Sequence, residues 1–158
     1  MNTLSRSIIA LAAVSFMTAP PVLSKEWQDK GTGTYVTVSS SSVKQANGNT
    51  VVHETFKGIV LSSVPGSIIN GTSQTGSGTT VLDAKGNLVL AVGYADGVDA
   101  DGDVFWIWWK TTPEKRTWGY NGGTGKFKGI TGGGTTTQLA YFPGDRSAIS
   151  WEGKVSVP

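Results

Sequence analysis

Four aspartates fall within the eight residues Asp96–Asp103, and carboxylates this close together repel one another unless a cation or solvent screens them. Asp99, Asp101 and Asp103 match positions 1, 3 and 5 of a calcium-binding loop. Position 6 of that loop holds valine instead of glycine, and position 12 holds lysine instead of glutamate. The segment is therefore not an EF-hand. It is a weak candidate for a calcium site, and a solvated acidic hairpin loop is the favoured interpretation.

His53 is the only histidine of the chain and lies in the alternating stretch VVHETFKG. A strand histidine beside threonine and lysine is most often partly exposed, although the same residue type could act as a pocket acid or base. A single histidine excludes a histidine-rich metal site, and no G-x-S-x-G elbow is present for a serine nucleophile. The chain has no cysteine, which excludes thiol catalysis and cysteine-ligated metals. No cofactor is expected beyond the weak calcium candidate.

The segment Val104–Trp109, VFWIWW, is the most apolar strand of the sequence. Trp106 and Trp108 share one face of this strand, and its other large residues share the opposite face. Apolar residues on both faces indicate a strand buried on both sides, with core packing as the simplest role. One face could instead form the wall of a ligand pocket together with Tyr94 and with Trp118 or Tyr120. An outward face left uncovered would be an apolar patch and would favour a homo-oligomer.

Polar side chains that could add chemistry to such a pocket are few, and each is of a type more common at the surface: Lys57, Arg116, Tyr141 and Glu152. Glu152 follows Trp151 on the last predicted strand, so the two side chains point to opposite faces. If Trp151 packs outward, Glu152 points into the interior, where burial would favour the protonated acid. The candidate pocket residues are therefore His53, Tyr94, Trp106, Trp108, Trp118, Tyr141 and Glu152.

Apolar and polar residues alternate along most of the chain, and turn-forming residues recur about every dozen positions, a pattern typical of an antiparallel sandwich or barrel. The predicted strands are Thr32–Val38, Thr50–Ser62, Gly78–Asp83, Leu88–Ala95, Val104–Thr111, Arg116–Tyr120, Thr135–Phe142 and Ala148–Val157. Turns are predicted at Asn47–Asn49, Lys85–Asn87, Asn121–Gly123 and Pro143–Asp145. No linker or internal repeat divides the chain, so one domain is expected.

The first 24 residues have the order of an export signal, with Arg6 first, the apolar run Ile8–Met17 next, and small residues before a cleavage point after Ser24. The apolar run is too short to span a membrane. Cleavage would leave residues 25–158 as one domain in the periplasm or medium of a bacterium. Without Arg6, 12 basic residues face 11 acidic ones, and a net charge of about +1 gives no electrostatic case for nucleic-acid binding.

Seven glycines lie in Tyr120–Thr137, YNGGTGKFKGITGGGTTT. The stretch fits neither the P-loop nor the dinucleotide fingerprint, and no helix can follow it to hold a phosphate. Strands of closed barrels bend at glycines and bulges, so Phe127 and Ile130 are expected to anchor a short kinked segment.

Part of this stretch, GGTGKFKGITG at Gly122–Gly132, resembles the glycine-rich hairpin of dirigent proteins and the corresponding segment of allene oxide cyclases. The order of predicted strands and the strand end Gly93–Ala95 agree with the resemblance. It implies an all-β fold, a single antiparallel eight-stranded β-barrel of calycin-like architecture over residues 25–158. A wider group of exported bacterial proteins carries the same hairpin. Outside the hairpin, the polar pocket positions of the family cannot be matched to this chain residue by residue, so no catalytic residue is carried over.

Three functions remain open. The favoured function is a non-catalytic barrel that binds a small apolar or aromatic molecule, because the sequence shows no convincing polar constellation for catalysis. The resemblance implies that such a pocket is used without a metal or organic cofactor. A cofactor-free isomerase or cyclase of the dirigent or allene oxide cyclase type would also need a polar constellation inside the barrel. A carbohydrate-binding or structural module would instead use an outward row of tryptophans. The fold alone does not choose among them.

Overall fold

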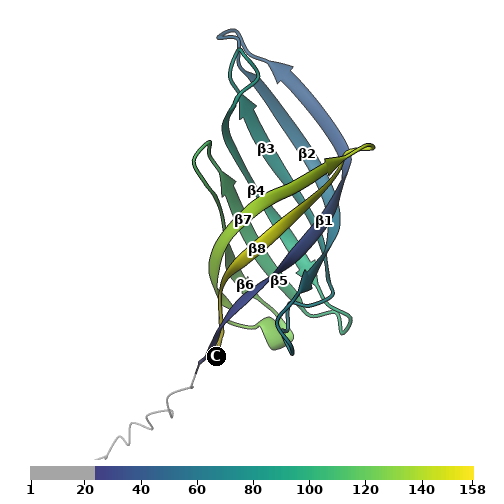
Figure 1. The fold of residues 1–158 in the computed structure, drawn as a ribbon, viewed down its shortest axis with the longest axis vertical. Coiled ribbons are helices and arrows are strands. Elements are labelled where there is room, and N and C mark those ends of the chain that lie inside the picture. The colour runs from purple at the N-terminus through teal and green to yellow at the C-terminus, as the bar shows by residue number, and fades with distance from the viewer. Residues whose placement is uncertain (1–23) are drawn as a thin grey trace, which may run out of the picture.

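The computed structural model describes residues 24–158, and the predicted export signal lies outside this range except for its last residue. The described chain forms a barrel of strands with one short 3-10 helix (Figure 1). Its elements are β1 (Lys25–Lys44), β2 (Thr50–Ser62), β3 (Thr72–Leu82), β4 (Leu88–Val98), β5 (Val104–Thr111), β6 (Arg116–Gly123), η1 (Gly125–Phe127), β7 (Thr131–Phe142) and β8 (Arg146–Val157). Within residues 24–158, no helix is long and apolar enough to cross a membrane.

The strands close into a barrel because each pairs antiparallel with the next and β1 also pairs with β8. Residues 25–36 of β1 pair with β8, whereas residues 31–44 of the same strand pair with β2. This offset between the two partners of one strand accompanies the tilt of strands around a barrel axis, which Figure 1 shows. The predicted eight-stranded antiparallel barrel is confirmed.

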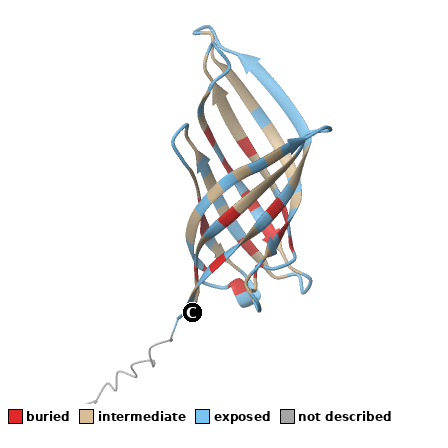
Figure 2. Ribbon diagram, viewed as in Figure 1, coloured by how far each residue is buried: buried red, intermediate tan, exposed pale blue. Residues whose placement is uncertain are grey.

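One end of the barrel is closed by the β2–β3 connection and by the segment between β6 and β7 (Figure 1). Phe127 and Ile130 of that segment are 0% and 1% exposed. They belong to one apolar cluster with Ile69 of the β2–β3 connection and with Phe105 and Val155 of the strands. Figure 2 shows most of the buried positions in this half of the barrel. The glycine-rich segment is therefore an apolar plug, whose two large side chains seal the end.

A buried carboxylate holds the β2–β3 connection in place across the closed end. Asp29 of β1 is 2% exposed and accepts hydrogen bonds from the hydroxyls of Ser62, at 2.5 Å, and Ser67. The backbone N–H of Lys30 donates to it at 2.8 Å, and the indole N–H of Trp27 donates at 3.3 Å. These four hydrogen bonds compensate for the removal of the Asp29 carboxylate from water.

The opposite end of the barrel carries the four hairpins that join β1 to β2, β3 to β4, β5 to β6, and β7 to β8 (Figure 1). Three of these turns were predicted from their residues, at 47–49, 85–87 and 143–145, and are confirmed. The strands rise past the core here, and the last residues of β1, from Ser39 to Lys44, are exposed. This end is therefore open.

Several strands begin earlier than predicted. β1 begins at Lys25, β3 at Thr72 and β7 at Thr131. The early residues of β3 pair with strands on both sides, and those of β1 and β7 pair with β8, so pairing extends strands into polar and glycine-rich segments. The turn predicted at Asn121–Gly123 is wrong. These residues continue β6, Gly123 pairs with Phe105 of β5, and the connection to β7 comes afterwards.

Candidate ligand-binding cavity

A cavity of about 710 Å³ lies inside the barrel, between its closed and open ends. Every strand contributes side chains to its wall, and the hairpin residues Gly86 and Asp145 border it at the open end. At the closed end it is bordered by the core residues Val60, Ile69 and Phe105. Small organic ligands are typically bound in pockets of about 300–1,000 Å³, so this volume suits one such molecule.

One part of the wall is a row of aromatic rings from three strands. The ring centroids of Tyr35 and Phe56 are 5.6 Å apart, and those of Phe56 and Trp109 are 6.5 Å apart. Trp109 reaches Phe56 by lying across the inner faces of β4 and β3, at Gly93 and Gly78. A Cβ atom on either glycine would lie 2.3 Å from Trp109 Cζ2, far inside van der Waals contact. The two glycines therefore create the space that the indole occupies.

A second group of rings lies nearer the closed end. Trp118 contacts Tyr120 and Trp151 edge to face, with centroid separations of 5.2 and 6.0 Å. Tyr120 in turn meets Phe105 edge to face at 5.5 Å. The indole N–H of Trp118 donates to the carbonyl of Thr135 at 3.2 Å, which fixes the ring on β6. These aromatic side chains make the wall near the closed end apolar, and their edge-to-face packing makes it rigid.

The inner wall includes two phenols, the buried Tyr120 and the half-buried Tyr35. The Tyr35 hydroxyl donates to Gln74 Oε1 at 2.8 Å, and Gln74 is 5% exposed. Burial raises the pKa of Tyr35, and burial together with the charge of Asp29 raises the pKa of Tyr120. Both phenols therefore stay neutral at physiological pH. The Tyr35 O–H is already donated to Gln74, the Tyr120 O–H can serve as a donor, and neither phenol can act as a phenolate base there.

Arg116 of β6 lines the cavity and is held by Gln138 of β7. Its Nη1 donates to Gln138 Oε1 at 2.7 Å. Gln138 Nε2 donates in turn to the carbonyls of Ala140, at 2.9 Å, and Ala148, at 3.0 Å. The register of β7 shifts between Gln138 and Ala140, and this irregularity of the sheet holds the Gln138 amide in place. The amide in turn holds the orientation of the Arg116 guanidinium.

Glu54 of β2 lines the cavity from the opposite wall, because three strands separate β2 from β6 in either direction around the barrel. Glu54 and Arg116 are both half-buried. The ion pairs of residues 24–158 lie elsewhere, at Lys126 and at Lys154. Within the barrel, one carboxylate and one guanidinium therefore lie on facing walls, while the exposed Asp145 and Arg146 border the cavity at its open end. Neither Glu54 nor Arg116 has an ion-pair partner within the described chain.

The structure places the predicted pocket residues on both sides of the wall. Trp118 lines the cavity at 8% exposure, and Tyr141 lies at its rim at 74% exposure. The others are exposed and point away from the interior: His53, Tyr94, Trp106, Trp108 and Glu152. Glu54, Ile107 and Trp151 face inward, and side chains alternate along a strand, so their neighbours must face outward. These five are not residues of the barrel cavity.

The outward tryptophans form a row on β5. Trp106 is 41% exposed and Trp108 is 36% exposed, and Tyr94 of β4 pairs opposite Trp108. The indole of Trp108 lies close against Gly119 of β6, since a Cβ there would be 2.8 Å from three of its ring atoms. One side of that ring is therefore covered by the sheet, while the residue as a whole remains accessible to solvent.

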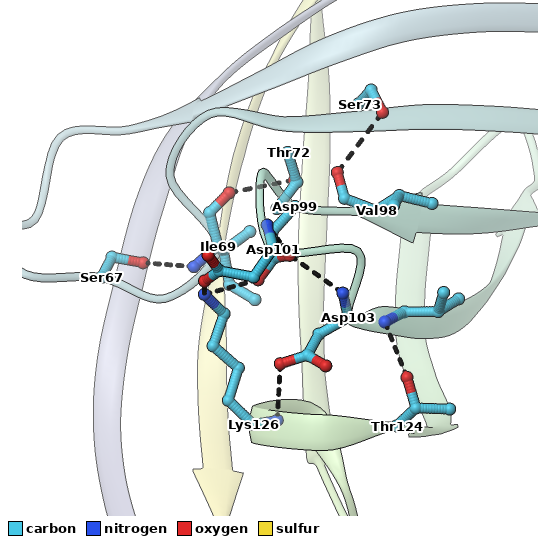
Figure 3. Close-up of polar contacts among 11 residues, drawn as sticks. Ser67, Ile69, Thr72, Ser73, Val98, Asp99, Asp101, Asp103, Thr124 and Lys126 are labelled. Atoms are coloured by element: carbon cyan, nitrogen blue, oxygen red, sulfur yellow. Dashed lines mark hydrogen bonds and ion pairs between the residues drawn. The ribbon is translucent and has the colours of Figure 1, made fainter.

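The acidic segment forms the β4–β5 hairpin at the closed end, and Lys126 of η1 reaches into it (Figure 3). Lys126 Nζ lies 2.5 Å from Asp99 Oδ2 and 3.0 Å from Asp101 Oδ2, and its backbone N–H donates to Asp103 at 3.0 Å. Hydrogen bonding to the ammonium lowers the pKa of Asp99 and raises that of Lys126. Among residues 24–158, no cluster of three or more His, Cys, Asp or Glu side chains is placed to hold a metal ion. The ammonium of Lys126 thus lies among the carboxylates of the weak calcium candidate.

Sequence reasoning missed Tyr35, Phe56, Trp109 and Glu54 as cavity residues and named Arg116 only as a candidate of a type more common at the surface. The signal that could have found the rings is the run of small residues on the inner faces of β3 and β4, namely Gly76, Gly78, Gly93, Ala95 and Gly97. Strands without inward side chains leave space that only large residues of neighbouring strands can fill.

Comparison with known structures places this barrel among the dirigent folds. The pterocarpan synthase dirigent protein GePTS1 superposes with a TM-score of 0.53 at 14% sequence identity, over 91% of this chain and 98% of that chain. The pterocarpan synthase dirigent protein PsPTS1 superposes with a TM-score of 0.52 at 14% identity, over 83% of this chain and 94% of that chain. No protein-family model and no curated protein matches the sequence. The chain is a dirigent-like β-barrel, and at this identity the likeness concerns the fold.

Proposed function

We propose that this protein is exported and binds a small aromatic or apolar molecule inside its barrel. The observation that carries the proposal is the open cavity of about 710 Å³ whose wall is built from aromatic rings. Burial of an apolar ligand there would release water from ring surfaces, and the phenols and amide of the inner wall would orient its polar groups. The dirigent-like fold supports a barrel of the ligand-binding or isomerase type.

A titration followed by tryptophan fluorescence tests the proposal. Trp109, Trp118 and Trp151 line the cavity, so a ligand that enters should quench or shift their emission in a saturable way. Ile107→Trp adds bulk to the cavity and should abolish the response. Trp106→Ala, at the next position on the same strand but on the outer face, is the matched control and should leave the affinity unchanged. If Ile107→Trp binds as well as the wild type, the ligand does not enter the barrel.

A cofactor-free isomerase or cyclase is a candidate because Glu54 faces the cavity together with two neutral phenols. A carboxylate could accept a proton from a bound substrate while a phenol donates a hydrogen bond to the group that gains charge. Glu54→Gln should then abolish turnover while leaving binding intact. Loss of both together would indicate a structural role for Glu54.

The outward row on β5 supports polysaccharide binding as another candidate. Trp106, Trp108 and Tyr94 expose aromatic surface beside Asp96 and Lys110, whose polar groups could bond sugar hydroxyls. Sedimentation with insoluble glucans, chitin or peptidoglycan tests it. The Trp106→Ala/Trp108→Ala variant should stay in the supernatant, whereas a Val89→Ala control, also at an exposed apolar position, should sediment like the wild type. Equal sedimentation of both variants would remove this candidate.

A further inference from the structure

Arg116 is an unusual group for an aromatic cavity because its partner in the structure is a neutral amide. A guanidinium offers five N–H donors, and the contact with Gln138 Oε1 uses Nη1. None of the ion pairs of residues 24–158 involves Arg116. A half-buried cation whose orientation is fixed, and whose charge no carboxylate of the described chain balances, is suited to an anion that arrives from outside.

We propose that Arg116 binds the carboxylate of an amphipathic aromatic acid, whose ring lies among the aromatic side chains of the barrel. This inference rests on the proposed ligand-binding function and adds the chemical class of the ligand. The planar fork of arginine matches a carboxylate with two parallel hydrogen bonds, which a lysine or an amide does not provide. The wall directly below Arg116 on β6 is aromatic, because Trp118 and Tyr120 follow it on the same inner face.

Gln138 is the positioning residue of this site. Its amide nitrogen is occupied by the carbonyls of Ala140 and Ala148, so its oxygen is left to face the guanidinium. The neutral oxygen orients Arg116 without cancelling its charge. Glu54 on the facing wall repels an anion and so favours one orientation, in which the carboxylate lies against β6 and β7.

Calorimetric titration with matched ligand pairs tests the inference on the purified protein. Phenyl-, naphthyl- and biphenylacetate are each compared with the corresponding neutral amide, which has the same ring and nearly the same shape. In the wild type, the carboxylate should bind about tenfold or more tightly than the amide, as expected for hydrogen bonds to a charged group. Arg116→Gln should remove this preference while leaving amide binding unchanged, and the retained amide binding shows that the barrel is folded.

Two further variants separate charge from structure. Gln138→Glu keeps the size of the side chain but gives Arg116 a permanent counter-ion, so it should also remove the carboxylate preference. Lys110→Gln is the matched control, since it removes one positive charge from the outer face of β5, opposite Thr117 of β6. It should keep the preference.

The outcomes distinguish the two proposals. Equal affinity for carboxylate and amide in the wild type, or a preference that survives Arg116→Gln, would overturn the assignment of Arg116 while leaving the cavity as a binding site. Failure of every pair to bind would overturn both.

Discussion

Replacing Gly97 with alanine should destabilise the barrel by overpacking a single ring. Gly97 of β4 pairs with Phe105 of β5, and a Cβ on Gly97 would lie 2.0, 2.4 and 2.5 Å from three atoms of the Phe105 ring. Carbon atoms in contact are normally about 3.5–4.0 Å apart, so the ring would have to move by about 1.5 Å. Phe105 is 1% exposed, and its ring packs against those of Tyr120 and Phe127, whose centroids are 5.5 and 5.0 Å away.

Because the neighbours of Phe105 are themselves rigid rings, the cost should lie near the upper end of the usual range for overpacking, about 3 kcal/mol. For a domain of this size, that corresponds to a fall in melting temperature of about 10 °C. Urea denaturation followed by tryptophan fluorescence measures the free energy of unfolding. Thr75→Ala, on the outer face of the neighbouring strand β3, is the control and should change stability by less than about 1 kcal/mol.

A double-mutant cycle shows whether the clash with Phe105 is the cause. Phe105→Leu alone should destabilise the barrel, because it removes buried ring atoms. Combined with Gly97→Ala, it should cost at least about 1 kcal/mol less than the sum of the single changes, since the new methyl group enters the space that the ring vacates. The reasoning is refuted if Gly97→Ala is as stable as the wild type, or if the two changes add.

The remaining predictions concern charge, pH, metal and processing. Glu54→Gln should strengthen the binding of aromatic carboxylates severalfold in the same calorimetric assay, because it removes a like charge from the facing wall; weaker binding would contradict the assigned orientation. Burial raises the pKa of Tyr35 and Tyr120 in the folded barrel, so as the pH rises the unfolded chain loses its phenol protons before the folded chain does. The free energy of unfolding should therefore keep the full contribution of these neutral phenols below about pH 10 and fall as the pH rises above it. Urea denaturation at about pH 8 and about pH 11 measures that fall, which Tyr35→Phe should reduce and which would not occur if the phenols were solvated. Calcium should leave the melting temperature of the wild type unchanged relative to chelator but raise that of Lys126→Met, in which the aspartates lose their ammonium partner; a calcium response of the wild type would show that the lysine is displaced. Mass spectrometry of the protein recovered from the periplasm or medium should give a chain that starts at Lys25, and an intact N-terminus would contradict the export signal.

The architecture could be predicted because it depends on strand alternation and turn residues. The turns at 47–49, 85–87 and 143–145 and the alternation in β8 are local signals, and each survives in the structure. The early part of β3 could not be predicted, because Thr72–Ser77 contains no apolar alternation. This segment is a strand because it is hydrogen-bonded to β2 and β4, although its own residues carry no strand signal.

The side of the wall on which each residue lies could not be predicted for strands with large residues on both faces. β5 is the clearest case, because Trp106 and Trp109 are equally plausible as pocket residues from periodicity alone. The side on which each indole lies is decided by the glycines of β4 and β3, which make room for the Trp109 ring inside the barrel, while Trp106 lies outside. Arg116 was a pocket candidate of a type more common at the surface. Alternation with Trp118 turns it inward, and its orientation depends on Gln138 at an irregularity of β7 that the sequence pattern does not indicate.

The pairing of β1 with β8 has a consequence for how the molecule reaches its native state. Lys25 pairs with Val157, so the first and last strands of the barrel are hydrogen-bonded neighbours. Hairpins can form as soon as each is synthesised, but the barrel cannot close until nearly the whole chain is present. Contacts between such distant residues make folding slow, and until closure the edges of β1 and β8 are open to pairing with other chains. A chain that crosses a membrane before it folds would complete this last step only on the far side.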